Sequence, residues 1–272
     1  MQPEGTAVVT GASRGIGRAV ALELAQRGFD VIATMRRPED GAGLAAEAAS
    51  AAGSLEVGRL DVTDPSSIDL PGSLRVLVNN AAVEKPHPPF EATPMELWRE
   101  MYETNVFGLI EVTRRAIPAL RAAAGGVICN VTSSSILAPV PFFGPYRSSK
   151  AAVSAIGESL RAELAPLGIR VLEIMPGPID TDMLAGSDRP PEAIDFEDYR
   201  PAAQRYYEGR SAIDSQITST ADAAHAIADA ILDDDAPLRV GCDPLAVGML
   251  EGWRASRDED FMRAMLPSWT GT

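Results

Sequence analysis

Tyr146 and Lys150, a tyrosine and a lysine four residues apart, are the side chains in this sequence best suited to proton transfer. A spacing of four places both on one face of a helix, one turn apart. A free phenol has a pKa of about 10, which is too high for proton transfer near neutral pH. A neighbouring ammonium favours the phenolate. The pair therefore predicts a general acid and base whose phenol pKa is lowered.

A run of hydroxyl side chains, residues 132–135, ends an apolar segment thirteen residues before the tyrosine. If that segment is a strand of a parallel sheet, its carboxyl end faces the ligand crevice. A hydroxyl at this point can donate a hydrogen bond to a carbonyl oxygen. We expect Ser133 to be that donor.

Three glycines near the start of the chain, Gly11, Gly15 and Gly17, separate a strand-like segment from a helix-like one. Glycine permits the sharp turn and lets the backbone approach a pyrophosphate at the helix N-terminus. Ordinary turns use glycine too. The position between the first strand and the first helix is what favours dinucleotide binding.

The segment after the second apolar run indicates which dinucleotide is bound. An NAD-preferring site needs an acidic residue there for the ribose 2′-hydroxyl, whereas residues 34–37 contain no acid and two arginines. The planar guanidinium of Arg36 is suited to pairing with a 2′-phosphate. Arg14, within the glycine turn, could close on the same phosphate. These arginines could also be solvated loop residues, but the missing acid and the added bases together favour NADP(H).

Short apolar segments alternate with helical patterns along the chain. We expect strands at 6–10, 29–34, 55–60, 74–78, 127–132, 169–174 and 238–240, and helices at 15–27, 38–52, 94–121 with an interruption near 105–108, 146–164 and 220–233. This order predicts an α/β fold: a doubly wound, Rossmann-like parallel sheet of seven strands with helices on both faces. No linker separates a second domain, so we expect one domain over 1–272. Residues 183–219 break the rhythm and are expected to form a substrate loop or lid, either ordered or mobile.

Composition excludes several classes of partner. The formal net charge of −14 argues against nucleic acids and anionic membranes. We see no signal peptide and no apolar stretch of roughly 20 residues, so a cytoplasmic location is expected. The two cysteines and two histidines have no metal-like spacing, so we expect no metal site. His87 lies in a proline-rich turn, where we expect a surface role.

Jointly, these motifs closely resemble the short-chain dehydrogenase/reductase family in its compact single-domain form. The matching segments follow the family's order and comprise residues 10–17, 61–62, 79–82, 105, 133, 146–150 and 176–181. Two positions depart from the family's usual residues: Ala82 stands where glycine is common, and Arg75 where an acid is common. The core chemistry does not depend on either.

The resemblance implies roles for individual residues. Tyr146 would be the acid in reduction and the base in oxidation, and Ser133 would orient the carbonyl. Lys150 would hold the nicotinamide ribose and lower the pKa of Tyr146, while Asn105 would anchor a water in a proton relay. Besides Tyr146 and Lys150, the implied cofactor-binding residues are Gly11, Ser13, Arg14, Gly15, Ile16, Gly17, Arg36, Asp61, Val62, Asn80, Ala81, Pro176, Gly177, Ile179 and Thr181.

The resemblance also implies an activity: an NADP(H)-dependent oxidoreductase that interconverts a ketone or aldehyde with an alcohol by hydride transfer. The C-terminal segment, residues 238–261, is similar to that of members acting on lipophilic alcohols, but it identifies no substrate. The alternative is an NADP(H)-binding regulator or scaffold of the same fold, although intact Ser133, Tyr146 and Lys150 argue against it. Epimerases and dehydratases of related type usually have longer chains. Family members commonly form homodimers or homotetramers, and we expect one of these.

Overall fold

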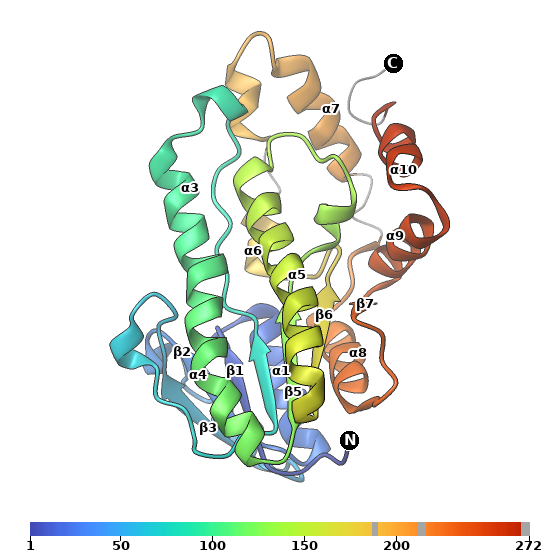
Figure 1. The fold of residues 1–272 in the computed structure, drawn as a ribbon. Coiled ribbons are helices and arrows are strands. Elements are labelled where there is room, and N and C mark those ends of the chain that lie inside the picture. Colours follow the sequence, from blue (N-terminus) through green and yellow to red (C-terminus); the bar gives the residue numbers. More distant parts are fainter. Residues whose placement is uncertain (187–189, 212–215, 268–272) are drawn as a thin grey trace.

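Seven parallel strands form the centre of the computed structural model, which describes residues 1–186, 190–211 and 216–267 (Figure 1). The strands are β1 (Thr6–Thr10), β2 (Asp30–Met35), β3 (Ser54–Arg59), β4 (Val76–Asn79), β5 (Gly126–Val131), β6 (Ile169–Met175) and β7 (Arg239–Gly241). Their order is β3-β2-β1-β4-β5-β6-β7, and every neighbouring pair is parallel. The predicted doubly wound α/β fold is therefore confirmed.

Helices cover both faces of the sheet. One face carries α1 (Gly15–Arg27) and α8 (Thr220–Leu232), which pack against each other. The other face carries α4 (Leu109–Ala122) and α5 (Gly144–Leu164). The π-helical turn η4 (Glu103–Gly108) continues α3 (Met95–Tyr102) into α4, at the interruption that the sequence predicts.

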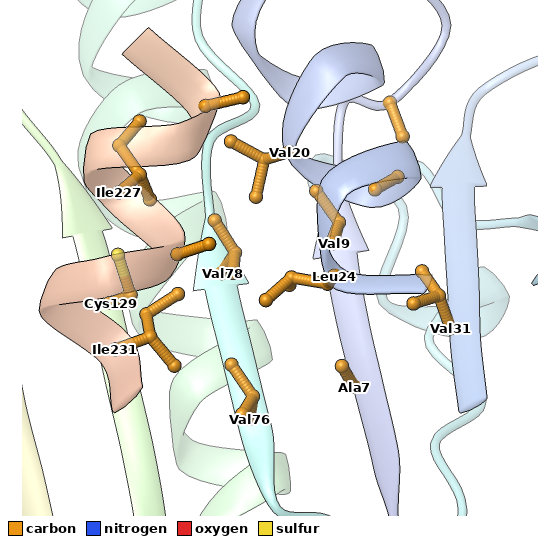
Figure 2. Packing of buried hydrophobic residues seen from close by; sticks show 14 of the residues in the cluster. Ala7, Val9, Val20, Leu24, Val31, Val76, Val78, Cys129, Ile227 and Ile231 are labelled. Atoms are coloured by element: carbon orange, nitrogen blue, oxygen red, sulfur yellow. The ribbon is translucent and has the colours of Figure 1, made fainter. Parts of the chain in front are cut away.

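The two faces are sorted by the alternation of side chains along each strand. Val76 and Val78 of β4 face α1 and α8, where Figure 2 shows them beside Leu24 and Ile231. Leu77, between them, belongs to the cluster on the opposite face. Both clusters are almost fully buried, as expected for a parallel sheet covered on two sides. This rigid core fixes the positions of the strand ends.

The Ala-rich segment 38–52 departs from prediction. It forms only η1 (Pro38–Gly41) and the short α2 (Leu44–Glu47). Gly43 adopts φ +87°, outside the helical region, and Gly41 packs against Met35, so that an added Cβ would lie 2.7 Å from its Cε. Two glycines therefore interrupt a composition that otherwise favours helix.

The two ends of the segment expected to be a lid lie side by side. Ile179 and Thr218 form a parallel bridge, in which the amide of Asp180 donates to the Thr218 carbonyl at 2.9 Å. Between them lie α6 (Asp182–Gly186), η7 (Glu192–Asp195) and α7 (Arg200–Ser211). Residues 187–189 and 212–215 of this expected lid lie outside the described residues.

The chain ends with two helices that we did not predict, α9 (Pro244–Ala255) and α10 (Asp258–Met265). Together with α7 they lie toward the side of the molecule to which the strand arrows point (Figure 1). The remaining short turns are η2 (Pro65–Ser67), η3 (Phe90–Ala92), η5 (Ser134–Leu137) and η6 (Ala165–Leu167). Among the described helices, none has both the length and the apolarity that crossing a membrane would need.

Candidate active site

A cavity of about 960 Å³ lies at the carboxyl ends of the strands. It adjoins the point between β1 and β4 where the strand order reverses, which is where open α/β sheets bind ligands. Its walls include the glycine turn, the segment after β4, the end of β5 and the start of α5. The sheet thus brings together segments that are far apart in the sequence.

Nearly all the site residues that the sequence predicts line this cavity. They are Gly11, Ser13, Arg14, Gly15, Ile16, Arg36, Asp61, Val62, Asn80, Ala81, Ser133, Tyr146, Lys150, Pro176, Gly177, Ile179 and Thr181. The two exceptions are Gly17 and Asn105, which are not among its lining residues. Both act on neighbours that do line it.

The glycine turn is shaped for close approach to a ligand. Gly11 and Gly15 have φ of +66° and +56°, the left-handed region that glycine adopts without strain. An added Cβ on Gly17 would lie 2.2 Å from the Asn80 Nδ2 atom, which donates to the Thr10 carbonyl at 3.0 Å. No acidic residue lies in the first turn of α1, so the positive end of the helix can accept an anion. These features fit the pyrophosphate of a dinucleotide.

Two arginines border the same end of the cavity. Arg14 and Arg36 both line it, and each can present a planar guanidinium to a phosphate. Arg14 Nη1 also lies 3.1 Å from the Asp182 carboxylate at the start of α6, and both side chains are largely exposed. The glycine turn and the lid are thereby joined by an ion pair that a bound phosphate could replace.

Tyr146 and Lys150 occupy the first two turns of α5. Pro145 lies in the first turn of this helix, where its missing N–H costs nothing and its fixed φ favours helix initiation. Lys150 Nζ donates to the Val131 carbonyl at 2.8 Å and lies 5.8 Å from the centroid of the Tyr146 ring. Both side chains are buried. The end of β5 therefore holds the lysine beside the tyrosine.

Burial dominates the protonation of this pair. Removal from water lowers the pKa of Lys150 to about 8, against a smaller opposing effect of the Glu84 carboxylate. Burial raises the pKa of Tyr146, the charge of Glu84 adds to the rise, and a hydrogen bond with Ser133 opposes it. The lowered phenol pKa that we expected is thus wrong for the protein by itself. The reason is that desolvation of the phenolate outweighs the hydrogen bond with Ser133. The side chain of Tyr146 therefore stays protonated near neutral pH.

Asn105 lies behind the cavity wall in the π-helical turn. Its Oδ1 accepts from the Val83 amide at 2.8 Å, and its Nδ2 donates to the Val83 carbonyl and to Ser149 Oγ, each at 3.0 Å. Val83 follows the cavity-lining segment after β4, and Ser149 directly precedes Lys150. The buried amide thereby fixes two walls of the site relative to each other. Its role as a water anchor stays a prediction.

The structure adds residues that the sequence did not single out. Glu84 lines the cavity, together with Tyr206 of α7 and with Phe143, which precedes α5. The expected surface role of His87 is wrong: its side chain is 11% exposed, and its ring stacks on Phe143 at 3.8 Å. Proline-rich composition predicts a turn but does not say against what the turn packs.

A buried aspartate connects the cavity to the C-terminal helices. Asp243 accepts from the Gly177 amide at 2.6 Å and from the Ala246 amide at 3.0 Å at the start of α9. An aspartate directly before a proline and a helical pattern is an N-cap signal, from which the start of α9 could have been predicted. Among the described residues, no group of three or more His, Cys, Asp or Glu side chains could hold a metal ion.

Comparison with known proteins agrees with this geometry. A model of the family described as short chain dehydrogenase matches residues 5–191. A Bacillus subtilis (strain 168) protein named uncharacterized oxidoreductase YusZ is 43% identical over 191 residues, which are 66% of this chain and 67% of that protein.

Two crystal structures share the fold over almost the whole chain. A short-chain dehydrogenase from Streptomyces avermitilis superposes with a TM-score of 0.78 and 31% identity, covering 100% of this chain and 98% of that one. A short chain dehydrogenase from Burkholderia cenocepacia J2315, in complex with NADP, has a TM-score of 0.73 and 29% identity and covers 95% and 97%. The matched sequence, the sheet order and the cavity lead to one conclusion: this chain belongs to the short-chain dehydrogenase family.

Proposed function

We propose that this chain is an NADP(H)-dependent oxidoreductase that interconverts a ketone or aldehyde with an alcohol, with Tyr146 as general acid and base. The observation that carries the proposal is the convergence of Ser133, Tyr146 and Lys150 on one cavity that the glycine turn also lines. A protein that only binds the cofactor does not need this convergence.

Each of the three side chains has a defined task in reduction. The hydride comes from the reduced nicotinamide when the cofactor is bound. The hydroxyls of Ser133 and Tyr146 donate hydrogen bonds to the carbonyl oxygen, and Tyr146 gives its proton to that oxygen as negative charge develops there. Lys150, with a pKa of about 8, is mainly an ammonium at neutral pH and stabilises the phenolate that remains.

The preference for NADP(H) over NAD(H) rests on charge. Arg14 and Arg36 border the cavity where the adenosine ribose would lie, and no acid ends β2. The Burkholderia cenocepacia relative was crystallised with NADP, which supports the same assignment here. Arginine forks are the side chains best suited to a 2′-phosphate.

The proposal is tested by measuring NADPH consumption over a panel of ketones, aldehydes, quinones and sterols with the wild type and Tyr146→Phe. We expect wild-type turnover of at least one carbonyl and a loss of about 10²-fold or more in kcat for the variant, the size of a general acid's contribution. NADPH affinity should remain near that of the wild type. Unchanged turnover in Tyr146→Phe would overturn the mechanism.

We also infer a homodimer or homotetramer. Phe107 in η4 and Ile110 in α4 expose 55% and 37% of their surface, respectively, and η4 also contacts α5. Exposed apolar side chains grouped on helices are a feature of subunit interfaces. Light scattering should give a mass of two or four chains for the wild type, and a smaller one for the double variant Phe107→Glu, Ile110→Glu.

A further inference from the structure

An acidic side chain, Glu84, faces the same cavity as the catalytic pair although proton transfer does not require it. It follows Val83, whose amide and carbonyl are both held by the Asn105 side chain. The backbone before Glu84 is therefore held in place by Asn105 of the π-helical turn. The Glu84 side chain is only 16% exposed.

The Glu84 carboxylate is oriented by a histidine. His87 Nε2 lies 2.8 Å from Glu84 Oε1. Because an ionised carboxylate can only accept, Nε2 must carry the proton in this contact. The other ring nitrogen, Nδ1, is buried and has no partner among the described residues.

The histidine is held in turn by an aromatic stack that reaches the catalytic tyrosine. The His87 ring lies nearly parallel to Phe143, with centroids 3.8 Å apart and an interplanar angle of 15°. Phe143 meets the edge of the Tyr146 ring at 6.4 Å and the Tyr206 ring at 5.5 Å. The orientation of the carboxylate is thus tied to the ring that transfers the proton.

The charge of Glu84 reaches the reacting groups. It raises the pKa of Tyr146, of Lys150 and of the lid residue Tyr206. These three groups lie on α5 and α7 and line the same cavity as Glu84. A substituent of a substrate bound against Tyr146 would meet this charge.

Much of the remaining wall of the cavity is apolar. It includes Val140 and Phe143 before α5, Leu245 and Met249 of α9, and Met265 of α10. A carboxylate in such surroundings discriminates strongly, because a group that cannot hydrogen-bond to it displaces water from the charge and gives no hydrogen bond in return.

We propose that Glu84, oriented by His87, is a substrate-recognition residue that selects carbonyl compounds bearing an O–H or N–H donor near the reacting carbon and rejects those bearing an anionic group there. This inference rests on the proposed carbonyl reduction and adds a substrate class to it. Substrates of this class have a donor close to the carbonyl and a lipophilic remainder. Keto acids and keto phosphates are excluded by charge.

Four ketones of matched shape test the inference with NADPH as reductant. Each has a phenyl group on the carbonyl: 2-hydroxy-1-phenylethanone, 2-(methylamino)-1-phenylethanone, 1-phenylpropan-1-one and phenylglyoxylate. For the wild type we expect kcat/KM for the better of the two donor-bearing ketones to exceed that of 1-phenylpropan-1-one by about 10-fold or more, the range of a hydrogen bond to a charged group. Phenylglyoxylate should be the poorest. Comparison of kcat/KM for the two donor-bearing ketones shows whether a hydroxyl or an ammonium donor is preferred.

Glu84→Gln keeps the shape of the side chain and removes its charge. It should abolish most of the donor preference and raise kcat/KM for phenylglyoxylate relative to that for 1-phenylpropan-1-one. Glu84→Asp, which keeps the charge but withdraws it, should give an intermediate preference and guards against a folding defect in Glu84→Gln. Glu96→Gln, at a carboxylate 82% exposed on α3, is the matched control and should leave all four ratios unchanged.

The same four compounds are titrated by calorimetry into protein saturated with NADP⁺. A donor preference in binding that is lost in Glu84→Gln supports the inference even if none of the four is reduced, an outcome that would count against the proposed function alone. Equal preferences in the wild type and Glu84→Gln, in turnover or in binding, would overturn the inference. So would a wild type that favours phenylglyoxylate.

Discussion

Asn105 grips both polar groups of the Val83 backbone, accepting from its amide at 2.8 Å and donating to its carbonyl at 3.0 Å. In a third hydrogen bond, Asn105 Nδ2 donates to Ser149 Oγ on α5. The π-helical turn that carries Asn105 therefore sets the distance between the segment after β4 and α5.

We predict that Asn105→Leu lowers the free energy of unfolding by about 2–4 kcal/mol, because it leaves the Val83 amide and carbonyl unpaired in a partly buried place. Asn105→Asp keeps the acceptor but loses both donations, and should cost an intermediate amount. Urea denaturation followed by circular dichroism measures both. If the unfolding curves of Asn105→Leu and the wild type have the same midpoint and slope, the hydrogen bonds between Asn105 and Val83 contribute nothing to stability.

Cofactor choice should respond to Arg36. Arg36→Asp places a carboxylate where the 2′-phosphate would bind, so NADPH affinity should fall by about 10-fold or more while NADH affinity changes little. Fluorescence titration with both cofactors measures this. Equal losses for the two would show that Arg36 does not contact the 2′-phosphate.

The ion pair between Arg14 and Asp182 predicts an opposite effect. Asp182→Asn removes the carboxylate that competes with a phosphate for the Arg14 guanidinium. NADPH affinity should therefore rise a few-fold at low salt, and the gain should shrink as salt screens the charges. NADH, which lacks the 2′-phosphate, is the control ligand. A rise of the same size for NADH would refute competition at this phosphate.

Lys150 should make the stability of the protein depend on pH. Its pKa is about 8 in the folded protein, below its ordinary value of 10.5. Between these values the unfolded chain binds the proton and the folded chain does not, so folding gains stability as pH rises. Relative to Lys150→Met, the wild type should gain about 2–3 kcal/mol from pH 7 to pH 10.

Urea unfolding at the two pH values gives this difference directly. Lys85→Met is the matched control, because Lys85 is partly exposed and pairs with Glu100. It should show no comparable gain. A constant difference between the wild type and Lys150→Met would contradict the lowered lysine pKa.

Removal of the Glu84 charge should move the pH profile of catalysis. Glu84 raises the pKa of Tyr146, so Glu84→Gln lowers it. Reduction needs the protonated phenol and falls as pH rises through this pKa; its descending limb should therefore move to lower pH. The ascending limb of alcohol oxidation should move the same way. Profiles of kcat for the wild type and variant test this, and a shift to higher pH would contradict it.

Local sequence patterns were enough to predict the parallel sheet of this protein and several residues of its cavity. The apolar segments around Val9, Val78 and Ile128 predict buried strands, and right-handed crossovers favour a doubly wound parallel sheet. The glycine turn and the spacing of Tyr146 and Lys150 are also local. Because parallel strands end at one edge, these patterns were enough to predict that residues 11, 133, 146 and 150 share one cavity.

What the sequence could not predict depends on contacts between distant segments. The sequence does not show that Phe143 will stack on His87, and nothing near Glu84 indicates that it will line a cavity together with residues of α5 and α7. The prediction of a lowered pKa for Tyr146 was wrong for the same reason. Its pKa follows from how deeply the assembled site buries it, and spacing along one helix carries no information about depth.

The bridge between Ile179 and Thr218 has a consequence for how the chain between them can be changed. Because Ile179 and Thr218 form an isolated bridge between the end of β6 and the start of α8, the length of chain between them does not affect the register of β6 and β7. Lengthening a loop adds only a logarithmic entropy cost. We therefore expect that the stretch between these two residues can be exchanged as a unit without disturbing the sheet.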